Sequence, residues 1–327
     1  MDQREYGDHA ALHDAEWRSR VQESARADVK AMLRATRRRR VERWLVASMV
    51  LVAIVAVLML LAGVGVFDRV FAESKGGTAV GESGNAESVL PAVDANRPFA
   101  RTPAADWADG EAGIQAPPPM RVGEFSAEEV ATTTARVREA LIASRLDPAL
   151  LTGHDPNRYL GLLAKDAAGQ LAPLFGTGRE PQAQALVSLI DGDSKLLPAT
   201  PKVSGSMKVE AGGPGELVVR TNYLFAYAFA GDPDSPPKDP MKIVVLVRAD
   251  VEYILRQGSR WTAGSQGLWY GDDVDGFGYS IACDAYKRGY LAPAYRDRGA
   301  THVPPKQDRT AYFDATAAIP AESGCPA

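Results

Sequence analysis

The chain of 327 residues has few of the side chains that metal and nucleophilic sites require: it has four histidines and two cysteines. A structural or catalytic metal site built from Cys and His needs several such residues at short spacing, and no such set occurs. His154 and His302, the two histidines of the C-terminal part, have no serine or cysteine nucleophile tied to them by spacing. The sequence therefore indicates no cofactor, no metal site and no catalytic residue.

Positive charge is lacking where a nucleic acid would need it. The formal net charge is -4, and residues 120–327 carry 22 Lys and Arg against 25 Asp and Glu. Proteins that bind nucleic acid rely on a basic surface, so no nucleic-acid partner is expected. A glycine-rich loop between a strand and a helix, as phosphate binding requires, is also missing.

A long hydrophobic run contrasts with these absences. From Trp44 to Val66 the chain has 23 residues without a charged or amide side chain. As a helix, this stretch is about 34 Å long, which is enough to cross a hydrocarbon core of about 30 Å. Residues 44–66 are therefore predicted to form one transmembrane helix.

Basic residues crowd the N-terminal flank of this run, where "RRRRVER" covers residues 37–43. The positive-inside rule places residues 1–43 in the cytoplasm and the C-terminal part outside the plasma membrane. The alternative is an export signal cleaved after Val70-Phe71-Ala72, although signal cores are shorter and their charged leaders are less extended. Both interpretations place the C-terminal part outside the cytoplasm.

The expected cytoplasmic segment, residues 1–43, carries one narrow apolar stripe at helical spacing, formed by Trp17, Val21, Ala25, Val29, Met32 and Leu33. With its basic residues, such a partly amphipathic helix suits anionic lipid of the inner leaflet or a partner protein. A flank that only orients the span is an equally good interpretation.

Small, polar and proline residues dominate the region after the span. Residues 67–119 show no apolar period, so they are predicted to be a flexible extracytoplasmic linker that cannot offset its ordering entropy by burial. Three prolines at Pro117–Pro119 mark the start of the exported domain, residues 120–327.

This exported domain is predicted to be α+β, with helices followed by a curved antiparallel sheet in a core of about residues 124–270. Ser126 and Glu129 have the spacing of a capping box, Asp155-Pro156 marks a second helix start, and a third helix is expected across 181–190. Period-two patterns then predict strands at residues 202–211, 216–230, 241–256 and 259–270.

Helices followed by long strands, with "VEYILRQGSRWTAGS" as a hairpin, resemble the nuclear-transport-factor-2-like superfamily over roughly residues 124–270. The resemblance implies a cone in which a curved sheet wraps around a long helix. Within that superfamily the chain looks like exported, membrane-anchored proteins similar to mammalian-cell-entry-associated proteins. The resemblance rests on pattern, and it assigns no functional residue to this chain.

Alternate residues of two expected strands supply the candidates for a pocket, namely Arg248, Asp250, Glu252, Tyr223, Phe225 and Tyr227. Charged residues inside the cone would suit a base or a ligand clamp. The alternation of Ile243 to Leu255 instead favours a charged trio that faces solvent. The aromatic row is interpreted first as core packing and second as a ligand wall.

The C-terminal part, residues 271–327, is predicted to be a tail attached to the core. "GDDVDGFG" at 271–278 lacks the first ligand and the final glutamate of a calcium loop, so an acidic turn after the last strand is expected. The tail has no periodic apolar run, and its cysteines, Cys283 and Cys325, are predicted to form a disulfide. Two thiols too far apart to bond are the alternative.

These patterns favour a non-catalytic interaction or scaffold domain that is accessory to a cell-envelope complex, with an envelope protein as partner. The alternative is a pocket protein for a lipid or another small molecule, or an acid/base enzyme, in the same cone. The span shows no pair of small residues at four-residue spacing that would argue for dimerisation.

Overall fold

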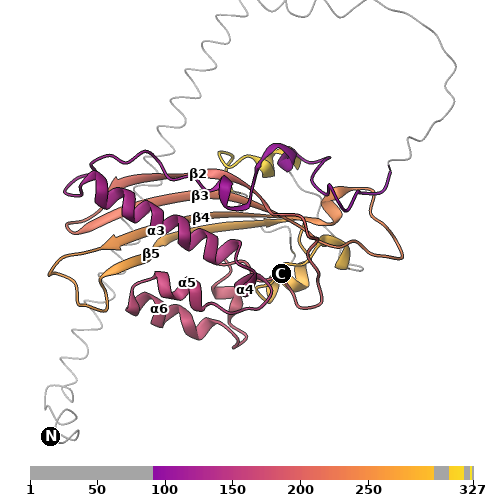
Figure 1. Cartoon of the computed structure of the whole chain (residues 1–327). Coiled ribbons are helices and arrows are strands. Elements are labelled where there is room, and N and C mark those ends of the chain that lie inside the picture. The colour runs from indigo at the N-terminus through magenta and orange to yellow at the C-terminus, as the bar shows by residue number, and fades with distance from the viewer. Residues whose placement is uncertain (1–90, 298–308, 320–324, 326–327) are drawn as a thin grey trace, which may run out of the picture. The chain divides into compact units, whose positions relative to one another are not determined.

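The computed structural model describes residues 91–297, 309–319 and 325. The expected membrane span at 44–66 and the cytoplasmic segment 1–43 lie outside these residues. Within the described ranges, no helix is both long enough and apolar enough to cross a bilayer. The described part is α+β, with a curved antiparallel sheet as predicted (Figure 1).

The sheet has five strands in the order β1-β2-β3-β4-β5, and all neighbours are antiparallel. Its strands are β1 (Ala108–Asp109), β2 (Lys202–Ala211), β3 (Glu216–Ala228), β4 (Val244–Arg256) and β5 (Gly267–Tyr279). The α-helices are α3 (Ala127–Arg145), α4 (Pro148–Leu151), α5 (Asn157–Leu162), α6 (Lys165–Leu171) and α7 (Cys283–Lys287). Short 3-10 turns include η2 (Pro103–Asp106), η3 (Gly110–Gly113), η5 (Glu180–Gln182) and η8 (Arg309–Phe313).

Strands β2, β3 and β4 follow the period-two pattern of the sequence closely. β2 has the predicted bounds, whereas β3 ends two residues early and β4 begins three residues late. The register pairs Tyr223 with Ala249 and Phe225 with Val247, so the aromatic row of β3 lies beside small and branched residues of β4. Such cross-strand pairs stabilise a sheet by side-chain packing.

The position of β5 corrects the prediction. The expected strand 259–270 begins only at Gly267, and the expected acidic turn at 271–278 lies inside the strand, which continues to Tyr279. β4 is 13 residues long, and β5 pairs with it from Arg256 to Leu246. The acidic segment 271–278 is therefore hydrogen-bonded to β4 as a strand instead of forming a turn. Backbone groups of β4 that a turn would leave unpaired are thereby satisfied.

Helices α3 to α6 cover one face of the sheet, which is called the inner face here (Figure 1). The capping box at the start of α3 is confirmed: the Glu129 amide donates to Ser126 Oγ (3.3 Å), and the Ser126 amide donates to the Glu129 carboxylate (2.8 Å). The second helix start is confirmed one residue later than expected, because α5 begins at Asn157 with its amide bonded to Asp155.

The expected third helix at 181–190 is wrong. A 3-10 turn at Glu180–Gln182 is followed by turns, and Ile190 forms a parallel bridge with Leu291. Residues 186–190 are all buried in succession. A run that is buried on every side does not need the one-sided spacing of a surface helix, which explains the failed prediction.

The described part of the expected flexible linker, residues 91–119, is ordered, which corrects that prediction from residue 91 onward. Phe99 and Ala104 are buried against the other face of the sheet, the outer face, and Ile114 belongs to the inner core. Between them, β1 pairs with the edge of β2. A few well-separated apolar residues anchor this segment, so it shows no periodic signal.

The tail contributes to the core, although it has no periodic apolar run. Phe313 is buried with the outer-face cluster, and Tyr312 stacks on Tyr279 at 4.1 Å and on Phe277 at 5.3 Å between ring centroids. The predicted disulfide is present: Cys283 and Cys325 are bonded, with Cα atoms 5.3 Å apart.

Candidate functional site

The aromatic candidates on β3 lie on the inner face and fill it. Tyr223, Phe225 and Tyr227 are fully buried in the main core cluster, beneath the helices. The Tyr223 hydroxyl donates to the carbonyl of Gln115 (3.3 Å), and the Tyr227 hydroxyl donates to the carbonyl of Arg145 (2.9 Å). Burial raises the pKa of Tyr223 and of Tyr227 to about 12. These side chains are packing groups of the core rather than walls of an open pocket.

The charged candidates lie on the outer face, but they do not simply face solvent. The side chains of Arg248, Asp250 and Glu252 are 11%, 27% and 14% exposed. Arg248 pairs with Asp250 (3.1 Å) and also donates to the carbonyl of Ala317 in the C-terminal segment, while Glu252 pairs with Arg220 (2.7 Å). The tail covers this part of the outer face. The trio therefore points away from the inner core, as expected, but it is largely covered instead of exposed to solvent.

These two groups therefore do not meet in one cavity. Alternation along β4 places Ala249 and Val251 in the inner core, and it turns Arg248, Asp250 and Glu252 to the opposite side. All three charged side chains have partners, so none is a free base poised beside an apolar hollow.

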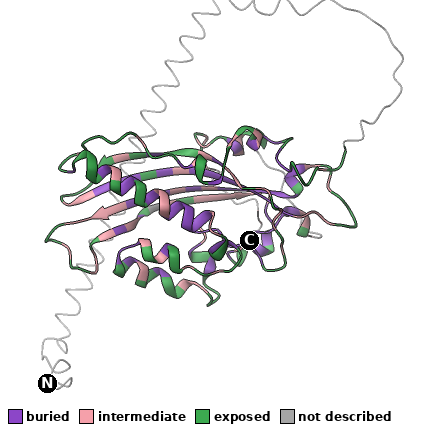
Figure 2. Cartoon of the chain, viewed as in Figure 1, coloured by how far each residue is buried: buried purple, intermediate pink, exposed green. Residues whose placement is uncertain are grey.

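A residue that the sequence analysis did not single out, Arg145, is the most unusual side chain of the described part. It ends α3, and its side chain is only 1% exposed. Figure 2 shows why: the C-terminal half of α3 is buried, whereas its N-terminal half is largely exposed. An arginine in the last turn of a helix normally lies at the surface, where its positive charge interacts favourably with the helix dipole. The position of Arg145 in the sequence therefore gave no sign that its side chain is buried.

Arg145 is held by neutral acceptors. Its Nη1 donates to Ser188 Oγ (3.1 Å) and to the carbonyl of Gln184 (3.4 Å), its Nη2 donates to the carbonyl of Ala185, and its Nε makes no hydrogen bond. Among the residues that the structure describes, no carboxylate forms an ion pair with it. Burial lowers the pKa of this guanidinium, although the neighbouring tyrosines oppose that shift.

Three tyrosines surround this cation, namely Tyr159, Tyr227 and Tyr253. Burial raises the pKa of each hydroxyl, so all three stay neutral at ordinary pH. The hydroxyls of Tyr159 and Tyr253 influence each other's pKa, although neither makes a hydrogen bond of ordinary geometry. The cluster thus offers dipoles to the guanidinium but no negative charge.

Arg145 also lines a cavity of about 80 Å³, which is called the Arg145 cavity here. The cavity lies between the C-terminal end of α3, residues 184–187, the first half of β4, the end of β5 and the segment after β5. Its other polar or charged lining residues are Gln184, Arg248 and Tyr286, although the side chain of Arg248 turns to the outer face. Two glycines of β5, Gly276 and Gly278, form part of its wall, where the missing side chains leave room.

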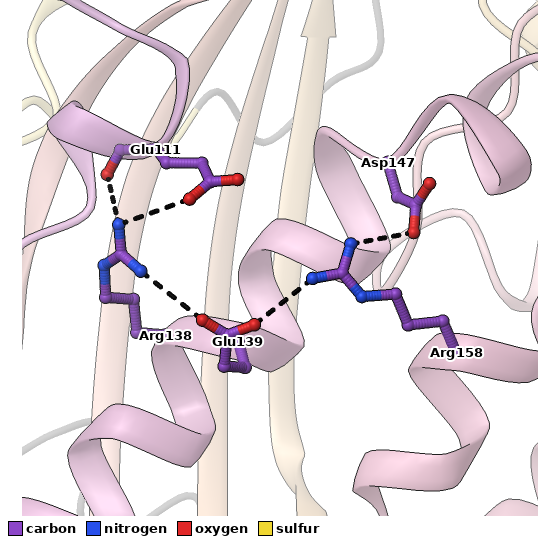
Figure 3. A network of polar contacts seen from close by, with 5 residues as sticks. All are labelled: Glu111, Arg138, Glu139, Asp147 and Arg158. Atoms are coloured by element: carbon purple, nitrogen blue, oxygen red, sulfur yellow. Dashed lines mark hydrogen bonds and ion pairs between the residues drawn. The ribbon is translucent and has the colours of Figure 1, made fainter.

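A chain of ion pairs lies on the surface of the helical layer (Figure 3). Arg138 contacts Glu111 (3.6 Å) and Glu139 (3.4 Å), and Arg158 contacts Glu139 (3.2 Å) and Asp147 (2.9 Å). The chain joins η3, α3 and α5, three elements that are separate in the sequence. Exposed pairs of this kind contribute little each, so we assign them to orientation of the helices rather than to chemistry.

The described residues do not hold a group of His, Cys, Asp or Glu that would bind a metal ion. His154 is used structurally, since its Nε2 lies 2.8 Å from the carbonyl of Ile190 and its ring packs on Tyr290. The described residues of this site therefore place hydrogen-bond donors, those of Arg145 among them, beside a small cavity. In comparisons with known protein families, with curated proteins and with solved structures, nothing matches this chain.

Proposed function

We propose that this is a single-pass membrane protein that presents its α+β domain outside the plasma membrane and acts by binding an envelope protein, not by catalysis. The apolar run at 44–66 and its basic flank support the anchor and the orientation. The disulfide between Cys283 and Cys325 supports export, because such bonds persist in oxidising compartments. The proposal includes a distant likeness to nuclear-transport-factor-2-like cones, supported by a long helix against a curved sheet.

We propose binding instead of catalysis because the inner face of the sheet is filled by side chains. In a cone that binds a lipid or a substrate, the hollow between helix and sheet must hold the ligand, and such pockets measure about 300–1,000 Å³. Here Tyr223, Phe225, Tyr227 and Tyr253 occupy that place and are fully buried. The Arg145 cavity of about 80 Å³ is far below the size of a lipid pocket.

The surface of the described residues indicates which kind of partner suits the domain. Met120, at 64%, is the one large hydrophobic side chain exposed in these ranges. Obligate interfaces are more apolar than the rest of a protein surface, whereas non-obligate interfaces resemble it. We therefore expect a reversible, polar contact with an envelope protein.

Two experiments test this function. A phosphatase reporter fused after residue 119 should be active outside, and one fused before residue 40 should be inactive; equal or reversed activities contradict the orientation. A mature chain that begins at Glu73 contradicts the anchor.

For the binding mode, the full-length protein is incubated with an envelope lipid extract, repurified and analysed by mass spectrometry. Clean protein supports partner binding. Stoichiometric retention of a lipid within the folded domain contradicts the filled cone and favours the pocket class.

A further inference from the structure

We propose that the Arg145 cavity binds a small anion with a carboxylate-like head. This inference goes beyond partner binding and does not depend on it. Arg145 is a buried side chain of the cavity wall that keeps one N–H donor, Nε, without a partner.

The charge balance of the site is the first argument. A buried charge is normally paired, because removing an ion from water is unfavourable unless a counter-charge compensates it. Arg145 has only hydroxyl and carbonyl acceptors, and its three tyrosine neighbours are neutral. Arg248 also belongs to the lining, but its side chain turns to the outer face, where it pairs with Asp250. The cavity therefore holds one positive charge in excess.

The lining of the cavity is the second argument. None of its lining residues is acidic, so no described side chain of the wall competes with an incoming anion. Asp275 is close enough to influence the Tyr286 hydroxyl, but it is exposed and does not line the cavity. Gly276 and Gly278 line the cavity on the β5 side, where the absence of side chains leaves space.

Size and shape select the class of ligand. A volume of about 80 Å³ admits several waters or the head of one small anion, since one water needs roughly 10–15 Å³ of such space. A guanidinium can pair with the oxygens of a carboxylate, and the Nε of Arg145 is the donor that its protein neighbours leave unpaired. Acetate, formate or the end of a short acidic metabolite fits this description, and a long-chain lipid does not.

The disulfide-bonded segment forms one wall of the site. Tyr286 in α7, Gly289 and Leu291 line the cavity, and α7 begins at Cys283. The bond to Cys325 therefore holds the helix that carries this wall. Reduction should weaken anion binding, which makes the site sensitive to the compartment in which the domain folds.

The test uses the full-length protein in detergent and carbon-13-labelled acetate as the probe. Ionic strength is held constant with the sodium salt of HEPES, whose anion is too large for the cavity. We expect saturable broadening of the acetate resonance and a downfield shift of one arginine Nε–H resonance in arginine-labelled protein. Absence of saturable binding by acetate, nitrate and phosphate overturns the proposal.

Matched variants locate the site. Arg145→Met should weaken acetate binding by about tenfold or more and remove the shifted Nε–H resonance, because the excess charge is lost. Arg136→Met removes an exposed arginine of the same helix, which donates to the carbonyl of Leu162 (2.8 Å), and should leave binding unchanged. Equal binding by Arg145→Met and the wild type would refute the site.

A second variant keeps the test decisive if Arg145→Met does not fold. Gly276→Val leaves the guanidinium in place and fills space, since a Cβ there lies 3.2 Å from the carbonyl of Arg248 and 3.9 Å from the Cα of Ala185, another lining residue. We expect it to abolish acetate binding with the fold retained. Undiminished binding by a folded Gly276→Val protein places the anion elsewhere and overturns the proposal.

Discussion

The two faces of the sheet are covered in different ways. The inner face lies beneath helices α3 to α6, which come from one continuous stretch of chain, and its centre is aromatic. The outer face lies beneath two irregular segments, residues 91–107 and 309–319, which come from opposite ends of the described domain. Figure 2 shows buried residues on the strands between these two layers.

The same strand serves both faces. Tyr223, Phe225 and Tyr227 of β3 point into the inner core, and Leu224 and Ala226 between them point into the outer cluster. The inner cover has caps, helical spacing and local contacts. The outer cover depends on a few anchors and one disulfide, so we expect it to open first in hydrogen exchange.

The largest expected effect is on the inner face. Phe225→Ala removes a fully buried ring from a closely packed core and should lower the free energy of unfolding by about 3–5 kcal/mol. Leu224→Ala, its neighbour on the outer face, should cost less, because an irregular cover can relax into the space. Urea denaturation measures both variants; an equal or larger loss for Leu224→Ala would show that the outer cover is as rigid as the inner one.

The disulfide is the next largest contribution, and it ties Cys325, which follows residues 309–319 in the sequence, to the start of α7. Cys325→Ala removes a crosslink between residues 42 apart in the sequence and should lower the free energy of unfolding by about 2–4 kcal/mol. Hydrogen exchange in residues 309–319 should rise more than in α3. If non-reducing mass spectrometry finds two free thiols in protein isolated from its native host, the disulfide does not contribute to stability and this prediction is wrong.

Stacking of the tail on β5 is a smaller term. Tyr312→Ala removes two stacked contacts, with Tyr279 and Phe277, and should cost about 1–2 kcal/mol. Limited proteolysis should then cut near residues 309–319 sooner, while the helices keep their protection. If the helices lose protection to the same degree, the two covers unfold together and the distinction between them fails.

The accuracy of the sequence-based predictions also differs between the two faces of the sheet. The capping box, β2, β3 and β4 have local patterns and were predicted to within three residues at each end. The outer cover has no period, because isolated residues such as Phe99 and Phe313 anchor it. One available signal was missed: "YLFAYAFA" at 223–230 and "IVVLV" at 243–247 are continuous apolar runs, which are typical of strands buried on both faces.

The candidate site was less predictable than the fold. Pairing of Arg248 with Asp250 two residues later follows from strand alternation, but the burial of Arg145 depends on distant segments, from Ser188, 43 residues away in the sequence, to Tyr227, 82 residues away. An arginine at the end of a helix is ordinary in a sequence. Only the tertiary structure shows that Ser188 and two backbone carbonyls enclose it.

The smallest expected effect separates charge from packing in the inner cover. Asp147 caps α4, accepting from the amide of Ala149 (3.0 Å), and pairs with the half-exposed Arg158 (2.9 Å). Burial acts to raise the pKa of Asp147, but the hydrogen bonds from Arg158 and Ala149 outweigh it, so this pKa lies below its ordinary value of 3.8. The folded protein therefore binds the proton less tightly than the unfolded chain does, and the ionised carboxylate favours folding.

This contribution is fully present above the ordinary pKa and is lost as the pH falls through the lower pKa of the folded state. Asp147→Asn keeps a good helix cap and removes only the charge, so it should cost less than about 1 kcal/mol at pH 7 and nothing at the acid end. Urea denaturation of both proteins between neutral and acid pH measures the difference. In an Arg158→Met background the substitution should lose most of its effect, because the cation that favours the ionised carboxylate is gone; an unchanged effect there would assign it to the cap rather than to the pair.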